Sequence, residues 1–174
     1  EELMADSLAA KRVEIAIVSF GPVEVVNEFQ TAERFTPPHL SASKDTPMGQ
    51  AITRGLEMLA QRKALYREHG IPFFRPWVFL ITDGSPTDDW QAAALEIRKG
   101  EESRAFAFFA VGVEGANLDI LQRIALRQPL RLKGLRFREL FQWLSNSMRS
   151  VSRSVPGTEV PLSNPATPDG WASI

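Results

Sequence analysis

Two unbroken apolar runs constrain the fold of this chain more than any other feature of its sequence. The first is Trp77-Val78-Phe79-Leu80-Ile81, and the second covers residues 105–113. Apolar side chains at successive positions predict strands that are buried on both faces. The two runs begin about 27 residues apart, with helix-forming sequence between them, which is the size of a β-α-β unit. We therefore predict a mostly parallel central sheet with helices on both faces.

The remaining segments extend this alternation of strands and helices. Residues 13–20 predict a central strand with two apolar faces, whereas residues 23–29 interleave Glu24 and Glu28 with valines. One polar face is typical of an edge strand, so we expect one antiparallel edge hairpin that turns at Gly21-Pro22. Apolar spacing predicts helices over residues 3–10, 48–69, 118–125 and 137–151, a further helix after Thr87, and a short strand over residues 129–132. The expected fold class is three-layer α/β.

Polar residues mark the starts of two of these helices. Pro47 suits the first position of the long helix, with Thr46 as its N-cap. Thr87 suits the N-cap of the next helix, with Asp88 and Asp89 in its first turn, where the helix dipole favours carboxylates. Each of these residues therefore has a structural interpretation beside any functional one.

Proline spacing separates the end of the chain from the rest. We expect a domain over residues 1–154 and an extended tail over residues 155–174, where repeated prolines exclude regular structure. The prolines are Pro156, Pro161, Pro165 and Pro168. Trp171 is the one large apolar residue near the end of the tail, and we expect it to dock on the domain body.

Composition excludes several classes of protein. The chain of 174 residues has a net charge of −1 and no cysteine, which excludes disulfides, thiol catalysis and cysteine zinc sites. It has no apolar run of the roughly 20 residues that span a bilayer. Residues 127–153 are basic, but we interpret them as a solvated helix face because Phe137 and Phe141 fall on the buried stripe. We expect a cytoplasmic protein that binds neither nucleic acid nor membrane.

Two groups of oxygen-bearing side chains should lie at the carboxyl-end edge of the sheet, where open parallel sheets bind ligands. Asp83 directly follows the first buried strand, and Asp45-Thr46 precedes the long helix. Carboxylate and hydroxyl oxygens are hard ligands, which suit Mg²⁺ or Mn²⁺ better than zinc. Asp83 also suits a plain turn residue beside the next helix dipole.

The order of these motifs resembles the von Willebrand factor type A (VWA) domain. Thr46-Pro47-Met48-Gly49 opens a helix, and a buried strand later runs into Ile81-Thr82-Asp83-Gly84-Ser85-Pro86-Thr87-Asp88. Residues 135–145 and 151–157, with the closing Gly170-Trp171, are most similar to the bacterial tellurite-resistance group of TerY-like proteins. The resemblance implies a VWA or Rossmann-like fold from Val13 onward.

The resemblance also implies a metal-ion-dependent adhesion site (MIDAS) built from three loops. Thr46 matches the threonine of the second loop and Asp83 the aspartate of the third, so these two residues are the implied metal ligands. The first loop carries Asp-x-Ser-x-Ser after the first strand, and this sequence has no such match in that place. We therefore expect a domain that is N-terminally incomplete, which leaves three outcomes: a fragment of a longer protein, a strand from a swapped partner in a dimer, or direct pairing of the two inner strands.

The implied function is protein binding at the sheet edge, with a partner's carboxylate completing the coordination of Mg²⁺ or Mn²⁺. The likened group implies a stress-response or tellurite-resistance assembly with kinase- or phosphatase-like partners. We expect no catalytic residue and no enzymatic activity. One alternative is a metal-dependent hydrolase or phosphatase that uses the Asp83 loop, although Ser85 stands where a phosphoaspartate enzyme needs a second aspartate. The other alternative is a scaffold that binds without metal.

Overall fold

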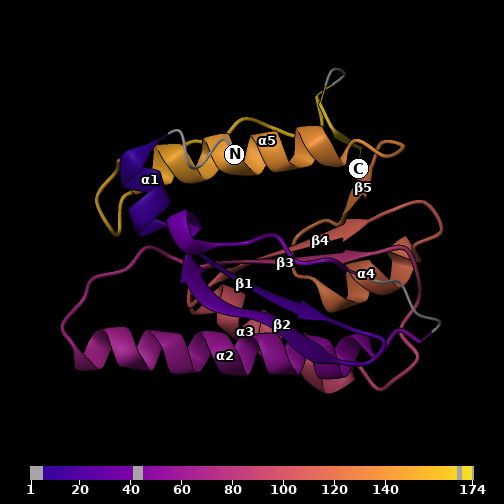
Figure 1. Cartoon of the computed structure of the whole chain (residues 1–174). Coiled ribbons are helices and arrows are strands. Elements are labelled where there is room, and N and C mark those ends of the chain that lie inside the picture. Colours follow the sequence, from indigo (N-terminus) through magenta and orange to yellow (C-terminus); the bar gives the residue numbers. More distant parts are fainter. Residues whose placement is uncertain (1–5, 41–44, 168–169, 174) are drawn as a thin grey trace.

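The computed structural model describes residues 6–40, 45–167 and 170–173 and confirms the expected three-layer α/β architecture (Figure 1). Residues 3–5 of the expected first helix and residues 168, 169 and 174 of the tail lie outside the described residues. The strands are β1 (Glu14–Ser19), β2 (Glu24–Thr31), β3 (Trp77–Thr82), β4 (Ala107–Gly112), β5 (Leu130–Leu132) and β6 (Ala172–Ser173). The helices are α1 (Ser7–Arg12), the 3₁₀ turn η1 (Ala32–Arg34), α2 (Met48–Glu68), α3 (Gln91–Glu102), α4 (Leu118–Ile124) and α5 (Phe137–Ser152).

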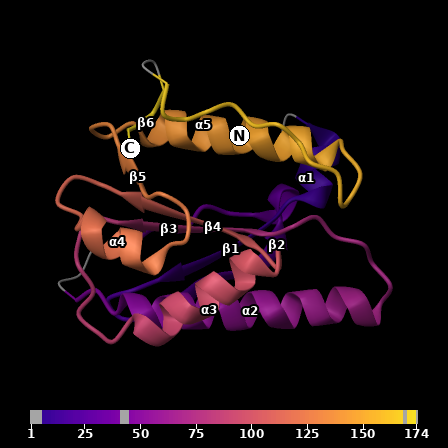
Figure 2. The same ribbon diagram turned by 180° about the vertical axis from the view of Figure 1, so that it is seen from behind.

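Helices cover both faces of the strand layer. Helices α2 and α3 lie along one face, while α1 and α5 lie along the other, and the view from behind shows the same arrangement (Figure 2). Alternate side chains of β3 and β4 point to opposite faces and so enter two apolar cores. Leu80, Phe108 and Ala110 pack toward α2, α3 and α4. On the α5 side, Val111 packs with Leu132, Leu140, Trp171 and Ala172, joined by half-buried Phe79 and Ile81.

The strands fall into two separate sheets. β1 pairs antiparallel with β2, as the sequence predicts for the edge hairpin. β3, β4 and β5 are parallel neighbours in that order, and β6 is antiparallel to β5. Among the described residues, no ladder joins β1 to β3, so direct pairing of the two inner strands is not observed. Each of these strands therefore has one edge without a ladder partner in the described part of the chain.

Strand β1 is also held by a charged contact with α2. Arg62 Nε donates a hydrogen bond to Glu14 Oε2 at 2.8 Å, and Arg62 Nη2 donates to the other carboxylate oxygen. Burial raises the pKa of Glu14, but hydrogen bonds from Arg62 and Tyr66 outweigh that effect and hold the pKa below its ordinary value. This contact ties the hairpin to α2, although no ladder joins the hairpin to β3 in the described part of the chain.

The proline-rich tail packs back onto the domain. Trp171 is only 3% exposed, and its ring lies edge-on to Trp143 with the ring centroids 5.7 Å apart. Trp143 Nε1 donates a hydrogen bond to the carbonyl of Ser163 at 2.9 Å, so the tail is also held along its length. The expectation that residues 155–174 contain no regular structure is wrong for β6, where no proline intervenes and the backbone can pair with β5.

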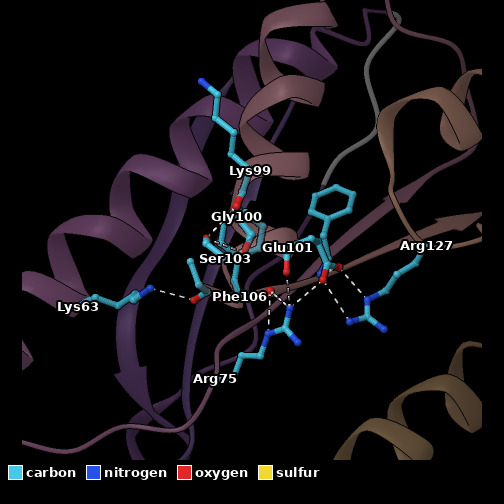
Figure 3. A network of polar contacts seen from close by, with 10 residues as sticks. Lys63, Arg75, Lys99, Gly100, Glu101, Ser103, Phe106 and Arg127 are labelled. Atoms are coloured by element: carbon cyan, nitrogen blue, oxygen red, sulfur yellow. Dashed lines mark hydrogen bonds and ion pairs between the residues drawn. The ribbon is translucent and has the colours of Figure 1, made fainter.

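A buried carboxylate fastens α3 to the amino ends of β3 and β4 (Figure 3). The Glu101 side chain is 3% exposed and accepts hydrogen bonds from Arg127 Nε at 2.7 Å and Arg75 Nη2 at 2.8 Å. It also accepts a hydrogen bond from the backbone N–H of Phe108 at 2.6 Å. Arg75 additionally donates to the carbonyl of Phe106. The buried charge is therefore paired, as a stable interior requires, and it lies at the end of the sheet opposite the candidate site.

Candidate functional site

Three loops meet at the carboxyl ends of β3 and β4 (Figure 1). Residues 45–47 lead into α2, residues 83–90 follow β3, and residues 113–117 follow β4. The N–H of Val113 donates to the carbonyl of Thr82 at 2.8 Å, which continues the ladder beyond the strands. Gly115 has a φ of +98°, and an added Cβ there would lie 2.9 Å from the carbonyl oxygen of Asp83. We call this set of loops the rim.

Two hydrogen bonds between Thr46 and Thr87 join the first two rim loops. The N–H of Thr46 donates to Thr87 Oγ1 at 3.0 Å, and the N–H of Thr87 donates to the carbonyl of Thr46 at 2.9 Å. The Thr46 side chain lies against Gly84, where an added Cβ would be 3.3 Å from the Thr46 hydroxyl oxygen. Gly84 directly follows Asp83, whose side chain is exposed. The structure therefore brings the two loops that carry the predicted ligands, Thr46 and Asp83, into contact.

The amino end of α2 is capped by a residue of the other loop. The carboxylate of Asp88 accepts hydrogen bonds from the N–H groups of Gly49 at 3.0 Å and Gln50 at 2.8 Å. The expected N-cap role of Thr46 is therefore wrong, since Pro47 occupies that position and makes no side-chain cap bond. The physical reason is a tertiary contact with a carboxylate 39 residues away in the sequence from Gly49, which no local pattern contains.

Helix α3 begins later than predicted for the same reason. Its first residue is Gln91, and the N-cap position belongs to Trp90, which is half-buried at the edge of the core. Thr87 is not its cap, because the Thr87 hydroxyl accepts the hydrogen bond from Thr46. Asp88 is not in its first turn, and Asp89 lies just before the helix, where its carboxylate accepts a hydrogen bond from Gln91 at 3.0 Å.

Gly49 lets the two rim segments approach closely. An added Cβ at this position would lie 2.3 Å from the carbonyl oxygen of Asp89 and 2.9 Å from Cα of Trp90. Both contacts are with backbone atoms, which cannot move aside cheaply. The glycine of the Thr46-Pro47-Met48-Gly49 motif is therefore the sequence signal that another chain segment lies directly on the start of α2.

Replacing Asp88 with alanine should lower the free energy of unfolding by about 1–2 kcal/mol, because two N–H groups of α2 lose their acceptor. Urea unfolding followed by circular dichroism measures this change. Asp45→Ala is a matched control, since Asp45 is an exposed carboxylate in the same rim and should change stability by less than about 0.5 kcal/mol. Equal losses for the two variants would contradict the capping role of Asp88.

The rim offers oxygen donors of the kind that bind divalent cations. The Thr46 hydroxyl and the carboxylates of Asp83 and Asp45 are hard ligands that suit Mg²⁺ or Mn²⁺. Across residues 6–40, 45–167 and 170–173, no group of three or more histidine, cysteine, aspartate or glutamate side chains is placed to hold a metal ion. The donors therefore fit the cation in kind, while a complete site needs further ligands.

A comparison with protein families decides the identity of the fold. The family model of the von Willebrand factor type A domain matches residues 38–131, which is more than half of the chain and includes all three rim loops. The chain belongs to the VWA domain family. VWA domains are protein-interaction modules, and many of them depend on a metal ion. Searches of curated proteins and of solved structures found no significant match.

Two residues brace the VWA rim through contacts that the sequence pattern did not predict. Thr87 and Asp88 brace the Thr46 loop, although their positions before a helix had indicated a local capping role. The only advance signal was the glycine at position 49. One further finding bears on partners: no helix in the described residues of this VWA domain combines the length and the apolar character needed to cross a bilayer.

Proposed function

We propose that this VWA domain binds a protein partner through the rim and that it is not an enzyme. The observation that supports this most is a pair of hydrogen bonds between Thr46 and Thr87. The Thr46 N–H donates to Thr87 Oγ1 at 3.0 Å, and the Thr87 N–H donates to the Thr46 carbonyl at 2.9 Å. These bonds fix the loops before any partner arrives, so binding loses little conformational entropy. An ordered surface with exposed oxygen ligands suits recognition, and Ser85 lacks the carboxylate that phosphoaspartate chemistry would require.

We further propose that Thr46 and Asp83 contribute two ligands to Mg²⁺ or Mn²⁺. The ion would supply a positive charge at the rim, and a carboxylate of the partner would complete its coordination. Thr46 is suited to this role because both of its backbone polar groups are already bonded to Thr87. The Asp83 backbone is packed closely against Gly115, which restricts the loop on its other side.

The remaining ligands would enter on a strand between β1 and β3. Both strands have apolar residues on both faces, and both lack a ladder partner on one edge among the described residues. Ile15, Ile17 and Val78 are only half-buried, although central strands of this composition are normally buried. An added apolar strand would pair the free backbone groups and cover these side chains. Run parallel to β3, it would end at the rim, where an Asp-x-Ser-x-Ser loop would complete the site.

The motif resemblance supports a more specific setting for this binding. Residues 135–145 and 151–157 are most similar to TerY-like proteins of tellurite resistance. We infer from them a cytoplasmic stress-response or tellurite-resistance assembly with kinase- or phosphatase-like partners. Co-purification from a tellurite-challenged host, with and without a chelator, tests this setting, and recovery of no such partner under either condition would reject it.

Magnesium titration of the described chain tests the metal site. We expect weak binding, with a Kd of about 1 mM or more, because two protein ligands are few for this cation. The amide shifts of residues 45 and 46, and of the non-proline residues in 83–90, should follow Mg²⁺. Asp83→Ala should abolish these shifts while the melting temperature changes by less than about 2 °C. A peptide with an apolar strand that ends in Asp-x-Ser-x-Ser, added in trans, should tighten binding about tenfold.

A charge-matched control separates the site from general electrostatics. Glu57→Ala removes an exposed carboxylate on α2 and should leave the Mg²⁺ shifts unchanged. Persistence of the rim shifts in Asp83→Ala would reject Asp83 as a ligand. Unfolding of Asp83→Ala or Thr46→Ala would instead assign the residue a structural role.

A further inference from the structure

An apolar hollow lies on the outer surface between α3 and α4. It is a shallow hollow, largely open to solvent, with a volume of about 400 Å³. Its lining residues are Trp90, Gln91, Ala94, Leu95, Arg98 and Arg123. Leu95, which is 59% exposed, and half-buried Trp90 both line this hollow. Both residues therefore contribute apolar surface that solvent can reach.

Two arginines flank the hollow, and no carboxylate is among its lining residues. The guanidinium of Arg123 lies over the Trp90 ring, 5.0 Å from its centroid, which holds the positive charge at the edge of the apolar surface. In the described part of the chain, neither Arg98 nor Arg123 forms an ion pair. Arg127, three residues before the next strand, differs because Glu101 neutralises it. The two guanidinium groups of the hollow are therefore available to pair with an anionic ligand.

We propose that this hollow binds an acidic segment of a partner protein. One large apolar side chain of the segment covers Trp90 and Leu95, and carboxylates on either side pair with Arg98 and Arg123. Charge complementarity selects this occupant, since the hollow has an apolar floor and two arginines that form no ion pair among the described residues. Nucleic acid fits less well, because a phosphate backbone requires a longer basic track than two arginines supply. The contact is independent of the metal site, since it uses neither Thr46 nor Asp83.

The test uses an acetylated, amidated hexapeptide with a central Leu-Phe pair between two Asp-Glu pairs. Nuclear magnetic resonance titration in the presence of EDTA should shift the amides of residues 90–98 and 120–124 with a Kd below about 1 mM. The double variant Arg98→Glu/Arg123→Glu should bind at least tenfold more weakly. The milder Arg98→Gln/Arg123→Gln variant should show a smaller loss of affinity. It replaces the double glutamate variant in the test if charge reversal impairs folding.

Two controls make the test specific. Arg138→Glu reverses an exposed charge on α5 and should leave the affinity unchanged. A peptide with lysines in place of the acids should not bind. The proposal is overturned if no amide shifts at about 5 mM acidic peptide, or if the lysine peptide binds as tightly as the acidic one. It is also overturned if the double variants bind the acidic peptide as tightly as the unchanged protein does. A single-stranded oligonucleotide that shifts the same amides more strongly would overturn it as well. Because EDTA removes divalent cations, these outcomes do not depend on the metal proposal.

Discussion

Glu101→Ala is expected to lower the free energy of unfolding by about 3 kcal/mol, near the lower end of the range for breaking a buried ion pair. The variant leaves the N–H of Phe108 without its acceptor and removes the shared partner of Arg75 and Arg127. The side chains of Arg75 and Arg127 are 33% and 43% exposed, so water can solvate the released cations and limit the loss. Urea unfolding with an unchanged m-value measures the effect.

Replacing both arginines should lower the free energy of unfolding by more than their partial exposure suggests. Arg75→Ala/Arg127→Ala leaves a carboxylate that is 3% exposed without a cation, which is the costlier half of the pair to strand. The triple variant that also removes Glu101 should regain part of that loss, because no charge then remains buried. Glu102→Ala is the matched control, since Glu102 is exposed, and should cost less than about 0.5 kcal/mol. A loss for Glu102→Ala equal to that for Glu101→Ala would contradict the network.

Trp171→Ala is expected to destabilise the protein by about 3 kcal/mol and to release the tail. The Trp171 ring is 3% exposed and packs in the α5-side core, and its backbone carbonyl accepts a hydrogen bond from the N–H of Lys133. The loss lies at the low end for a buried tryptophan because Trp171 Nε1 has no hydrogen-bond partner among the described residues, so its burial already carries a cost.

Unfolding experiments and hydrogen exchange at Ala172 measure these two effects of Trp171→Ala. Val155→Ala is a control in the same tail, since Val155 is 67% exposed and should change stability little. Removal of residues 155–174 should destabilise the domain at least as much as Trp171→Ala. A truncated protein as stable as the whole chain would show that residues 1–154 fold independently and would refute a stabilising role for the tail.

Local sequence patterns predicted most of the fold. The unbroken apolar runs gave β3 and β4, and helical spacing gave α2, because burial of both strand faces and of one helix stripe leaves a direct mark on composition. The expected burial of Phe141 is wrong, since it is 52% exposed. The apolar stripe of α5 is wider than its contact with the sheet, so Leu140 enters the core while Phe141 lies outside it.

The candidate site was only partly predictable. Asp83 follows a strand of the parallel sheet, so its place at the carboxyl-end edge followed from topology. Thr46 comes after the antiparallel strand β2, and its place at the same edge was inferred from its position at the start of the long helix. The roles of Thr87 and Asp88 could not be inferred in this way, because a hydroxyl or carboxylate before a helix looks the same whether it caps that helix or another one. The pairing of Glu101 with Arg75 and Arg127 was equally invisible, since its partners lie 26 residues away on either side.

The separation of the two sheets has a consequence for motion and for association between molecules. Since β1 and β2 share no ladder with β3, we expect the hairpin to open as its own cooperative unit, with amides that exchange before those of β4. Strand edges of this kind also template pairing with other chains, so concentrated solutions should self-associate through them. Any polypeptide that occupied the intervening space would suppress both the opening and the aggregation.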